Sequence, residues 1–289
     1  MKLSPNQPCW CGSGRKYKKC HMALDEKVRL YKDMGIPVPP HKLLKTPAQI
    51  EKMKESAKIN MACLDAVGEV IKAGMSTQEI DDIIYEVTTR AGAIPAPLDY
   101  EGFPKSVCTS INDEVCHGIP DEHIILQDGD IINVDVSTIL DGYFSDSSRM
   151  FLIGDVSEEK KRLVQVTKEC VEQGLKAVKP WGRLGDVGAA VNAYAKAHGY
   201  SVVRQIGGHG IGLEFHEDPW VSFVTEPGTG MLLVPGLTFT IEPMVNMGGP
   251  DIYTDEDNGW TVYTEDGQPS AQWEIMVTVT EDGCEVLCN

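Results

Sequence analysis

Four acidic residues and one histidine of this 289-residue chain form a set suited to binding metal ions. They lie in short strand-like or glycine-rich contexts, in the order Asp135, Asp146, His209, Glu242 and Glu274. One imidazole with four carboxylates is an oxygen-rich donor set that suits Mn(II), Fe(II) or Co(II) at least as well as zinc. If two of the carboxylates bridge, the set would hold two ions roughly 3.5 Å apart, an arrangement that activates water for hydrolysis.

The first two acids belong to a predicted β-hairpin. An Asp-Gly pair at 141–142 is typical of a two-residue turn between strands. With that turn, Ser137 pairs with Asp146 and Asp135 pairs with Ser148, so the two acids lie on one face as diagonal neighbours, roughly 7 Å apart. The ordinary alternative is that such acids mark turns. Asp135, however, lies inside an apolar strand, where an unpaired carboxylate would be costly.

The other three residues have their own local contexts. His209 lies in the glycine-rich segment 207–212, where the backbone can approach a ligand closely. A phosphate site is the natural alternative there, but the strand-loop-helix fingerprint and the Lys-Ser/Thr ending are missing. Glu242 ends a predicted strand and precedes Pro243. Glu274 alternates with apolar neighbours, so a solvated edge acid is its alternative.

Predicted helices precede the strands that carry these residues. Thr46 is expected as the N-cap and Pro47 as the first residue of a long helix. Ser76 and Glu79 predict a capping box for a second helix, which Gly92 ends.

The same order recurs at an offset of 107 residues. Ser157 begins a helix that reaches Val178, and Asp186 is expected to cap another, which Gly199 ends. The repeat predicts an α/β fold of two related halves, with the site between them.

The N-terminal region has a second set of ligand types. Cys9, Cys11, Cys20 and His21 lie within thirteen positions, and the Gly-Ser-Gly turn at 12–14 permits the sharp bend that a closed tetrahedral zinc site needs. A basic tail with incidental cysteines is the alternative. The segment resembles the SEC-C motif, which implies structural zinc and docking to ribosomes or to a protein partner. So short a segment would draw its folding free energy from the metal.

Composition is typical of a folded protein with one large domain or two smaller ones, with 42% hydrophobic residues. The longest apolar stretches are too short to cross a membrane, and the polar N-terminus is unlike a signal peptide, so a cytoplasmic protein is predicted. Nine cysteines in such a chain indicate reduced thiols or metal ligands.

Charge divides the chain unevenly. The net charge of −17 opposes broad binding to nucleic acid, yet residues 1–32 carry +6 and the remainder −23. Three parts are predicted: a zinc-binding motif at 1–32, a stiff proline-rich linker at 33–45, and a metal-dependent body at 46–289.

Longer motifs connect the body with a known family. They are Pro-Lys-Ser-Val-Cys-Thr-Ser-Ile-Asn-Asp-Glu-Val-Cys-His-Gly-Ile-Pro at 104–120, Gly-Gly-His-Gly-Ile-Gly at 207–212, Phe-His-Glu-Asp-Pro at 215–219, Thr-Ile-Glu-Pro-Met at 240–244 and Ser-Ala-Gln-Trp-Glu at 270–274. Together they resemble type I methionine aminopeptidase from about residue 46 to the end. The resemblance implies the pita-bread fold and removal of the initiator methionine from nascent polypeptides whose second residue is small.

The resemblance also implies a role for each ligand. Asp135 would chelate one divalent ion and His209 the other, together with Glu242. Asp146 and Glu274 would bridge the two ions, and water that the ions activate would attack the peptide. Glu242 would carry the proton.

Two histidines outside the ligand set, His117 and His216, match residues that steady the substrate and the developing oxyanion. The implied pocket for the methionine side chain comprises Tyr100, Phe103, Cys108, Phe215 and Trp260. Two positions depart from some relatives: Pro97 stands where cysteine is common, and Phe103 where tyrosine occurs. These departures concern the shape of the pocket rather than the chemistry.

Two other functions compete with this one. One is a proline-specific peptidase of the same fold, which the segments around His117 and from Trp260 to Glu274 fit less well. The other is a catalytically silent scaffold that binds ribosomes. Such proteins lose ligands, and here all five are present.

Overall fold

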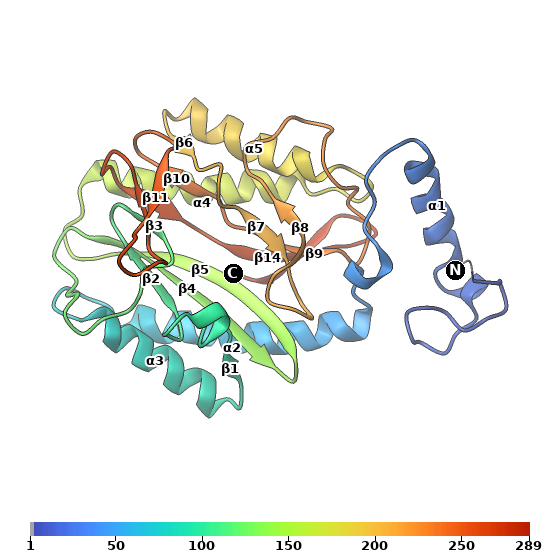
Figure 1. Cartoon of the computed structure of the whole chain (residues 1–289), viewed down its shortest axis with the longest axis horizontal. Coiled ribbons are helices and arrows are strands. Elements are labelled where there is room, and N and C mark those ends of the chain that lie inside the picture. Colours follow the sequence, from blue (N-terminus) through green and yellow to red (C-terminus); the bar gives the residue numbers. More distant parts are fainter. Residues whose placement is uncertain (1–2) are drawn as a thin grey trace.

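The computed structural model describes residues 3–289 and has strands in the middle with a pair of helices on each side (Figure 1). The α-helices are α1 (Met22–Asp33), α2 (Pro47–Val70), α3 (Thr77–Arg90), α4 (Glu158–Ala177) and α5 (Leu184–Ala197), and the short 3-10 helices are η1 (Tyr17–Lys19), η2 (His41–Leu43) and η3 (Tyr100–Gly102). Helices α2 and α3 cover one side of the strands, and α4 and α5 cover the other. This confirms the predicted α/β architecture of two halves.

The strands form two larger and two smaller antiparallel sheets. Their bounds are β1 (Ile94–Pro95), β2 (Cys108–Ile111), β3 (Glu114–Cys116), β4 (Ile131–Leu140), β5 (Tyr143–Leu152), β6 (Ser201–Val202), β7 (Gly208–Gly210), β8 (Glu217–Val221), β9 (Thr238–Ile241), β10 (Met244–Asn246), β11 (Ile252–Thr254), β12 (Val262–Thr264), β13 (Ser270–Gln272), β14 (Ile275–Val279) and β15 (Cys284–Cys288). In the first sheet, β1 and β2 pair with one edge of β4, and β5 pairs with the other. The order of the second sheet is β15-β14-β9-β7-β8. The smaller sheets are β13-β10-β6 and β11-β12-β3.

Polar side chains cap the N-termini of the long helices, largely as predicted. Thr46 and Ser76 each form a complete capping box at the start of α2 and α3. Ser157 accepts a hydrogen bond from the backbone of Lys160 at the start of α4. Helix α5 differs, because its N-cap is Arg183. Asp186 lies three residues inside, where its carboxylate accepts a hydrogen bond from the Arg183 backbone N–H at 3.1 Å.

Two apolar clusters hold the helix pairs against the strands. Val191 of α5 and Phe239 of β9 belong to the larger cluster, which also includes residues of α4 and β14. Leu64 of α2 and Ile132 of β4 belong to the second cluster, on the other side of the molecule. Burial of such side chains stabilises the fold by roughly 1.5–3 kcal/mol each. Within residues 3–289, no helix is long and apolar enough to span a membrane.

The N-terminal segment with α1 lies at one end of the molecule (Figure 1). The sequence did not predict this helix. The ring of Trp10 stacks on His41 with centroids 4.2 Å apart. The Lys27 ammonium lies 3.8 Å from the ring centroid of Trp181, on which Tyr31 also stacks. The segment therefore contacts the body through the linker and through the loop before α5.

Much of the predicted linker, 33–45, packs on the body. Pro37 accepts a hydrogen bond from the backbone N–H of Leu232 at 2.8 Å. Leu43, Leu44 and Lys45 are buried. The end of this segment is thus fixed in place next to the start of α2.

Candidate metal centre

The β4–β5 hairpin brings Asp135 and Asp146 together in the predicted register. Asp135 pairs with Ser148, and Ser137 pairs with Asp146. The two acids therefore lie on one face of the sheet, as the turn at 141–142 predicted. The Ser137 hydroxyl donates to Asp146 Oδ1 at 2.7 Å, which fixes the orientation of that carboxylate.

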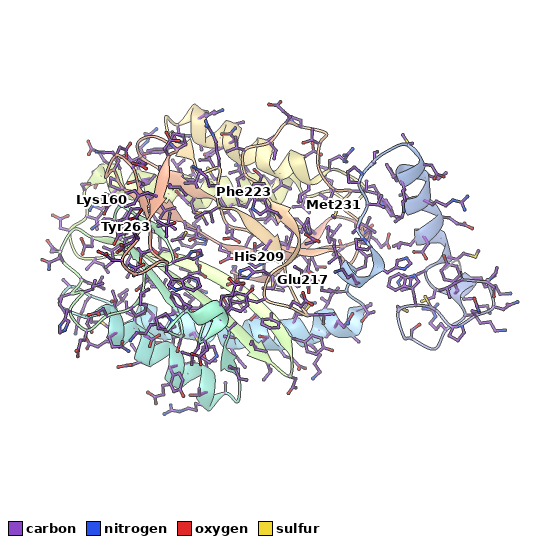
Figure 2. All side chains as sticks on the ribbon, in the orientation of Figure 1. Lys160, His209, Glu217, Phe223, Met231 and Tyr263 are labelled. Atoms are coloured by element: carbon purple, nitrogen blue, oxygen red, sulfur yellow. The ribbon has the colours of Figure 1, made fainter. Side chains whose placement is uncertain are left out.

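The second sheet supplies the other three residues. His209 is the middle residue of β7, and Glu242 directly follows β9. Glu274 directly precedes β14, and its backbone bridges to Ser148 on β5 through two hydrogen bonds of 3.3 and 3.4 Å. That bridge joins the two larger sheets at the site. Figure 2 places His209 between the helix pairs, in the middle of the molecule.

The five side chains converge on one cavity. His209 Nε2 lies 3.6 Å from Asp146 Oδ2 and 3.6 Å from Glu242 Oε1. Asp146, His209 and Glu274 each offer a ligand atom within 4.8 Å of the others. Asp135 and Glu242 line the same cavity. The structure thus brings together all five residues of the set.

Burial gives these acids unusual protonation behaviour. It raises the pKa of Asp135 to about 7 and that of Glu242 to about 8. It also raises the pKa of Asp146 and Glu274 well above the usual range, and the neighbouring carboxylates add to the effect. Desolvation disfavours a charged form, and carboxylates near one another disfavour joint ionisation.

This cluster fits divalent cations. Among residues 3–289, no lysine or arginine forms an ion pair with these four acids. Glu274 Oε1 is buried and has no hydrogen-bond partner. A buried acceptor without a donor is costly unless a cation occupies its lone pairs. The donor set and the uncompensated charge therefore both suit hard or borderline metal ions.

The orientation of His209 also suits a ligand. Its Nδ1 lies 3.0 Å from the carbonyl oxygen of Gly210, so Nδ1 carries the proton and donates to that oxygen. The lone pair of Nε2 then faces the acids. Burial lowers the pKa of His209 to about 3, which keeps the ring neutral. Metal-binding histidines are commonly oriented in this way by a second partner.

The cavity has a volume of about 800 Å³ and combines the acids with an aromatic wall. All five predicted pocket residues line it: Tyr100, Phe103, Cys108, Phe215 and Trp260. Pro97 and Phe103, the two departures from some relatives, are part of that wall. Trp260 contacts Phe103 edge to face, with ring centroids 5.2 Å apart.

The two further histidines also line the cavity. His117 has a left-handed backbone conformation, with φ of 57°, and its ring faces Trp260. Burial lowers the pKa of His117 to about 4. His216 stacks on Phe215, and its Nδ1 lies 2.9 Å from the Tyr100 hydroxyl.

The N-terminal ligands form a separate cluster. Cys9 Sγ and Cys20 Sγ lie 3.1 and 3.2 Å from His21 Nδ1, and Cys11 Sγ lies 3.6 Å from Cys20 Sγ. A tetrahedral zinc ion with Zn–S bonds of ~2.3 Å separates its sulfur ligands by roughly 3.7 Å. One ligand atom of each residue lies within 4.8 Å of the others, so the cluster fits one zinc ion.

Comparisons with known proteins match two families to separate parts of the chain. The model of metallopeptidase family M24 matches residues 51–281, and that of the SEC-C motif matches residues 6–23. Methionine aminopeptidase of Chlamydia trachomatis is 42% identical over 99% of this chain and 98% of its own length. Methionine aminopeptidase A of Synechocystis is 48% identical over 83% of this chain and 94% of its own length. The crystal structure of methionine aminopeptidase from Rickettsia prowazekii superposes with a TM-score of 0.84 at 44% identity, covering 85% of this chain and 99% of the other.

The chain belongs to the methionine aminopeptidases of metallopeptidase family M24. It is therefore a hydrolase, and its metal dependence and pita-bread fold are those of the family. An X-Pro aminopeptidase from Thermotoga maritima shares the fold, with a TM-score of 0.68 at 24% identity over 92% of this chain and 64% of the other. Fold alone does not separate the two activities, whereas the relatives at 42% and 48% identity do.

Several residues that hold the site of this aminopeptidase in place were not predicted. The Thr240 hydroxyl donates to Glu242 Oε1 at 2.6 Å and accepts from the His209 backbone N–H at 3.0 Å. Gln272 Nε2 donates to Glu242 Oε2 at 3.2 Å. Thr240 lies in β9, two residues before Glu242, and that strand-like spacing is a local signal that could have found it. Gln272 lies in β13 and reaches Glu242 from another part of the chain, so no local signal identifies it.

Proposed function

We propose that this enzyme releases the initiator methionine from nascent polypeptides whose second residue is small, with two divalent cations in the site. The observation that carries the proposal is the meeting of five ligands at an aromatic cavity. A catalytically silent scaffold would not need a cluster of acids whose burial costs free energy without bound cations.

The resemblance to the family implies a division of the ligands between the two ions, and the 3.6 Å from His209 Nε2 to Glu242 Oε1 suits their binding of one ion. Asp135 would hold one ion, His209 and Glu242 would hold the other, and Asp146 and Glu274 would bridge them. Bound ions supply Lewis acidity and lower the pKa of a water molecule, which is the chemistry that peptide hydrolysis requires. Thr240 and Gln272 would keep the Glu242 carboxylate fixed through their hydrogen bonds.

Glu242 is the proposed proton carrier. In the protein without ions, burial raises the pKa of Glu242 to about 8, and bound cations would favour the carboxylate form that can accept a proton. It would take a proton from the attacking water and give it to the nitrogen of the leaving amine. Asp135 chelates in this scheme and transfers no proton.

His216 and His117 would position the peptide. If the Tyr100 hydroxyl donates to Nδ1 of His216, the proton of the ring is on Nε2, which can donate to the oxygen of the scissile carbonyl. That oxygen gains charge in the transition state, so a fixed donor favours the reaction. The low pKa of His117 keeps its ring neutral, and a neutral ring donates from one nitrogen only.

The aromatic wall supports recognition of methionine. A thioether makes favourable contacts with aromatic rings, and Phe103, Phe215 and Trp260 supply three such rings around the cavity. Cys108 adds a buried thiol to the same wall, whose pKa burial raises, so it remains neutral. A neutral, apolar wall suits an uncharged side chain.

The decisive assay compares peptides. Protein loaded separately with Mn(II), Fe(II) or Co(II) is incubated with Met-Ala-Ser and with Ala-Pro-Ala. We expect free methionine from the first peptide and no cleavage of the second. Release of alanine from Ala-Pro-Ala without release of methionine would instead identify a proline-specific peptidase. Metal analysis of protein purified without added ions identifies the physiological ion and the zinc of the N-terminal cluster.

The N-terminal motif is proposed to hold structural zinc and to dock on ribosomes or on a protein partner. Its +6 charge suits an acidic surface such as ribosomal RNA. A cytoplasmic location follows from that role. Co-sedimentation with ribosomes should fall when residues 1–40 are deleted, and unchanged sedimentation would argue against docking.

A further inference from the structure

Glu217 lines the cavity beside the proposed substrate site and forms a buried ion pair with Lys45. The Lys45 ammonium contacts Glu217 Oε2 at 2.5 Å, and the two side chains are 1% and 6% exposed. These residues are 172 positions apart in the chain. A lysine is almost never fully buried without a partner, so the pair needs an explanation beyond surface charge. Figure 2 places Glu217 between His209 and the segment that leads to the N-terminal end.

The second oxygen of Glu217 holds a loop. Glu217 Oε1 accepts hydrogen bonds from the backbone N–H of Leu213 at 2.8 Å and of Glu214 at 3.1 Å. The loop between those residues and Glu217 carries Phe215 and His216, which line the cavity. The Glu217 carboxylate therefore accepts from the loop backbone through Oε1 and contacts the Lys45 ammonium through Oε2.

The backbone of Lys45 is fixed to the turn before β9 of the second sheet. Its backbone N–H donates to the carbonyl of Gly236 at 2.7 Å, in the turn that leads into β9 and so to Glu242. Its side chain crosses close to Gly212, where an added Cβ would lie only 2.8 Å from Lys45 Cε. Gly212 also has a φ of 141°, which side-chain-bearing residues rarely adopt. The lysine thus joins the strand of Glu242 to the loop of His216.

We propose that Lys45 and Glu217 are positioning residues of the aminopeptidase. The pair fixes the loop at 212–217 so that His216 meets the peptide carbonyl and Phe215 completes the methionine pocket. This inference rests on the proposed role of those two side chains. A buried pair that only adds stability would lie anywhere in the core, whereas this one bonds directly to the backbone beside His216.

The hydrogen bonding at Glu217 requires a carboxylate. Two N–H groups meet one oxygen and an ammonium meets the other, so both ends need an acceptor. A glutamine has the same shape but only one acceptor atom, and its amide NH₂ must face either the ammonium or the two N–H groups. Glu217→Gln is therefore an isosteric change that loosens the loop without removing atoms from the cavity wall.

A second substitution should relieve that conflict. With Lys45→Met in the same chain, the glutamine oxygen can accept from Leu213 and Glu214. Its NH₂ then no longer meets an ammonium group, so the conflict at that end is removed. The double variant should therefore recover most of the activity that Glu217→Gln loses. In a double-mutant cycle, such recovery would show that the effects of Lys45 and Glu217 on activity are strongly coupled.

The experiment measures kcat and KM for Met-Ala-Ser with metal-loaded full-length protein, together with amide hydrogen exchange of the segment 212–217. We expect Glu217→Gln to lower kcat by about 10- to 100-fold, because small misplacement of a catalytic group has effects of this size. Exchange at Leu213 and Glu214 should accelerate, and the bound metal content should stay that of the wild type. Lys54→Met is the matched control, since Lys54 of α2 forms a more exposed ion pair with Glu285 of β15. The control should change none of these quantities.

Three outcomes overturn the proposal, the first two on the single variant. One is a Glu217→Gln protein with wild-type kcat, and the other is unchanged exchange at Leu213 and Glu214. A double variant no more active than Glu217→Gln would also contradict it. Failure of the proposed function looks different, because the wild type would then release no methionine while the exchange results remained interpretable.

Discussion

Glu114 is a partly buried carboxyl that the proposed reaction does not use, and it gives the fold a predictable dependence on pH. It lies in β3, three residues before His117. Its Oε2 accepts from the backbone N–H of Ile111 at 2.7 Å, and its Oε1 accepts from the Tyr263 hydroxyl at 3.2 Å. Burial raises the pKa of Glu114 from 4.5 to about 7, despite both hydrogen bonds.

The sign of the effect follows from proton binding. Between pH 4.5 and 7 the folded state holds a proton on Glu114 that the unfolded state has released. Stability therefore falls as pH rises through this window, and the loss is complete above pH 7. A shift of this size corresponds to about 3 kcal/mol, and access of water to the partly buried side chain reduces the expected loss to about 2 kcal/mol.

Glu114→Gln should remove this dependence. The amide oxygen can accept from Ile111, and the NH₂ can donate to the Tyr263 hydroxyl, so the local hydrogen bonds survive. Urea unfolding of both proteins at pH 5 and at pH 8 gives the difference in free energy. At each pH, the free energy of unfolding of the wild type is subtracted from that of the variant. This difference should be about 2 kcal/mol larger at pH 8 than at pH 5. Other titrating groups cancel in this comparison.

Glu265→Gln is the matched control, because Glu265 is exposed and lies one residue beyond β12. The difference in free energy of unfolding between Glu265→Gln and the wild type should be the same at pH 5 and at pH 8. If Glu114→Gln also shows no change between pH 5 and pH 8, the carboxyl is ionised in the folded state throughout, and the reasoning from burial fails.

The remaining predictions concern the two metal sites. Asp135→Asn should abolish release of methionine and weaken retention of divalent metal, both measured on the purified protein; full activity would remove Asp135 from the site. Thr240→Val removes the donor to Glu242 and the acceptor for the His209 backbone N–H, so it should destabilise the protein by about 1–3 kcal/mol in urea unfolding and lower kcat. Changing Cys9 and Cys20 together to Ser should remove one equivalent of zinc while release of methionine survives; an equal loss of activity would refute a separate module.

Local rules made the hairpin predictable from the sequence. A two-residue turn at 141–142 and a side-chain period of two fix which residues of β4 and β5 share a face. The structure confirms the pairing of Asp135 with Ser148 and of Ser137 with Asp146. The helix starts at Thr46, Ser76 and Ser157 followed from the same kind of local rule.

Contacts between distant segments were not predictable in this way. Nothing near Lys45 in the chain indicates that its partner is Glu217, because the pairing depends on how the loop before β8 meets the start of α2. Helix α1 was also missed. Its apolar residues Leu24, Val28 and Tyr31 recur at helical spacing and pack partly on the body, so the signal was present in the sequence and was overlooked beside the zinc ligands.

The N-terminal motif and the catalytic body differ in composition, yet the segment 41–45 contacts both. Asp25 of α1 accepts hydrogen bonds from Trp10 and Tyr17 and lies 2.9 Å from His41 Nε2, so it orders the motif and holds the start of η2. Lys42 and Leu43 follow at once and line the cavity. Lys45 then reaches Glu217. The motif and the body are therefore joined by direct contacts along residues 41–45, although each has its own set of metal ligands.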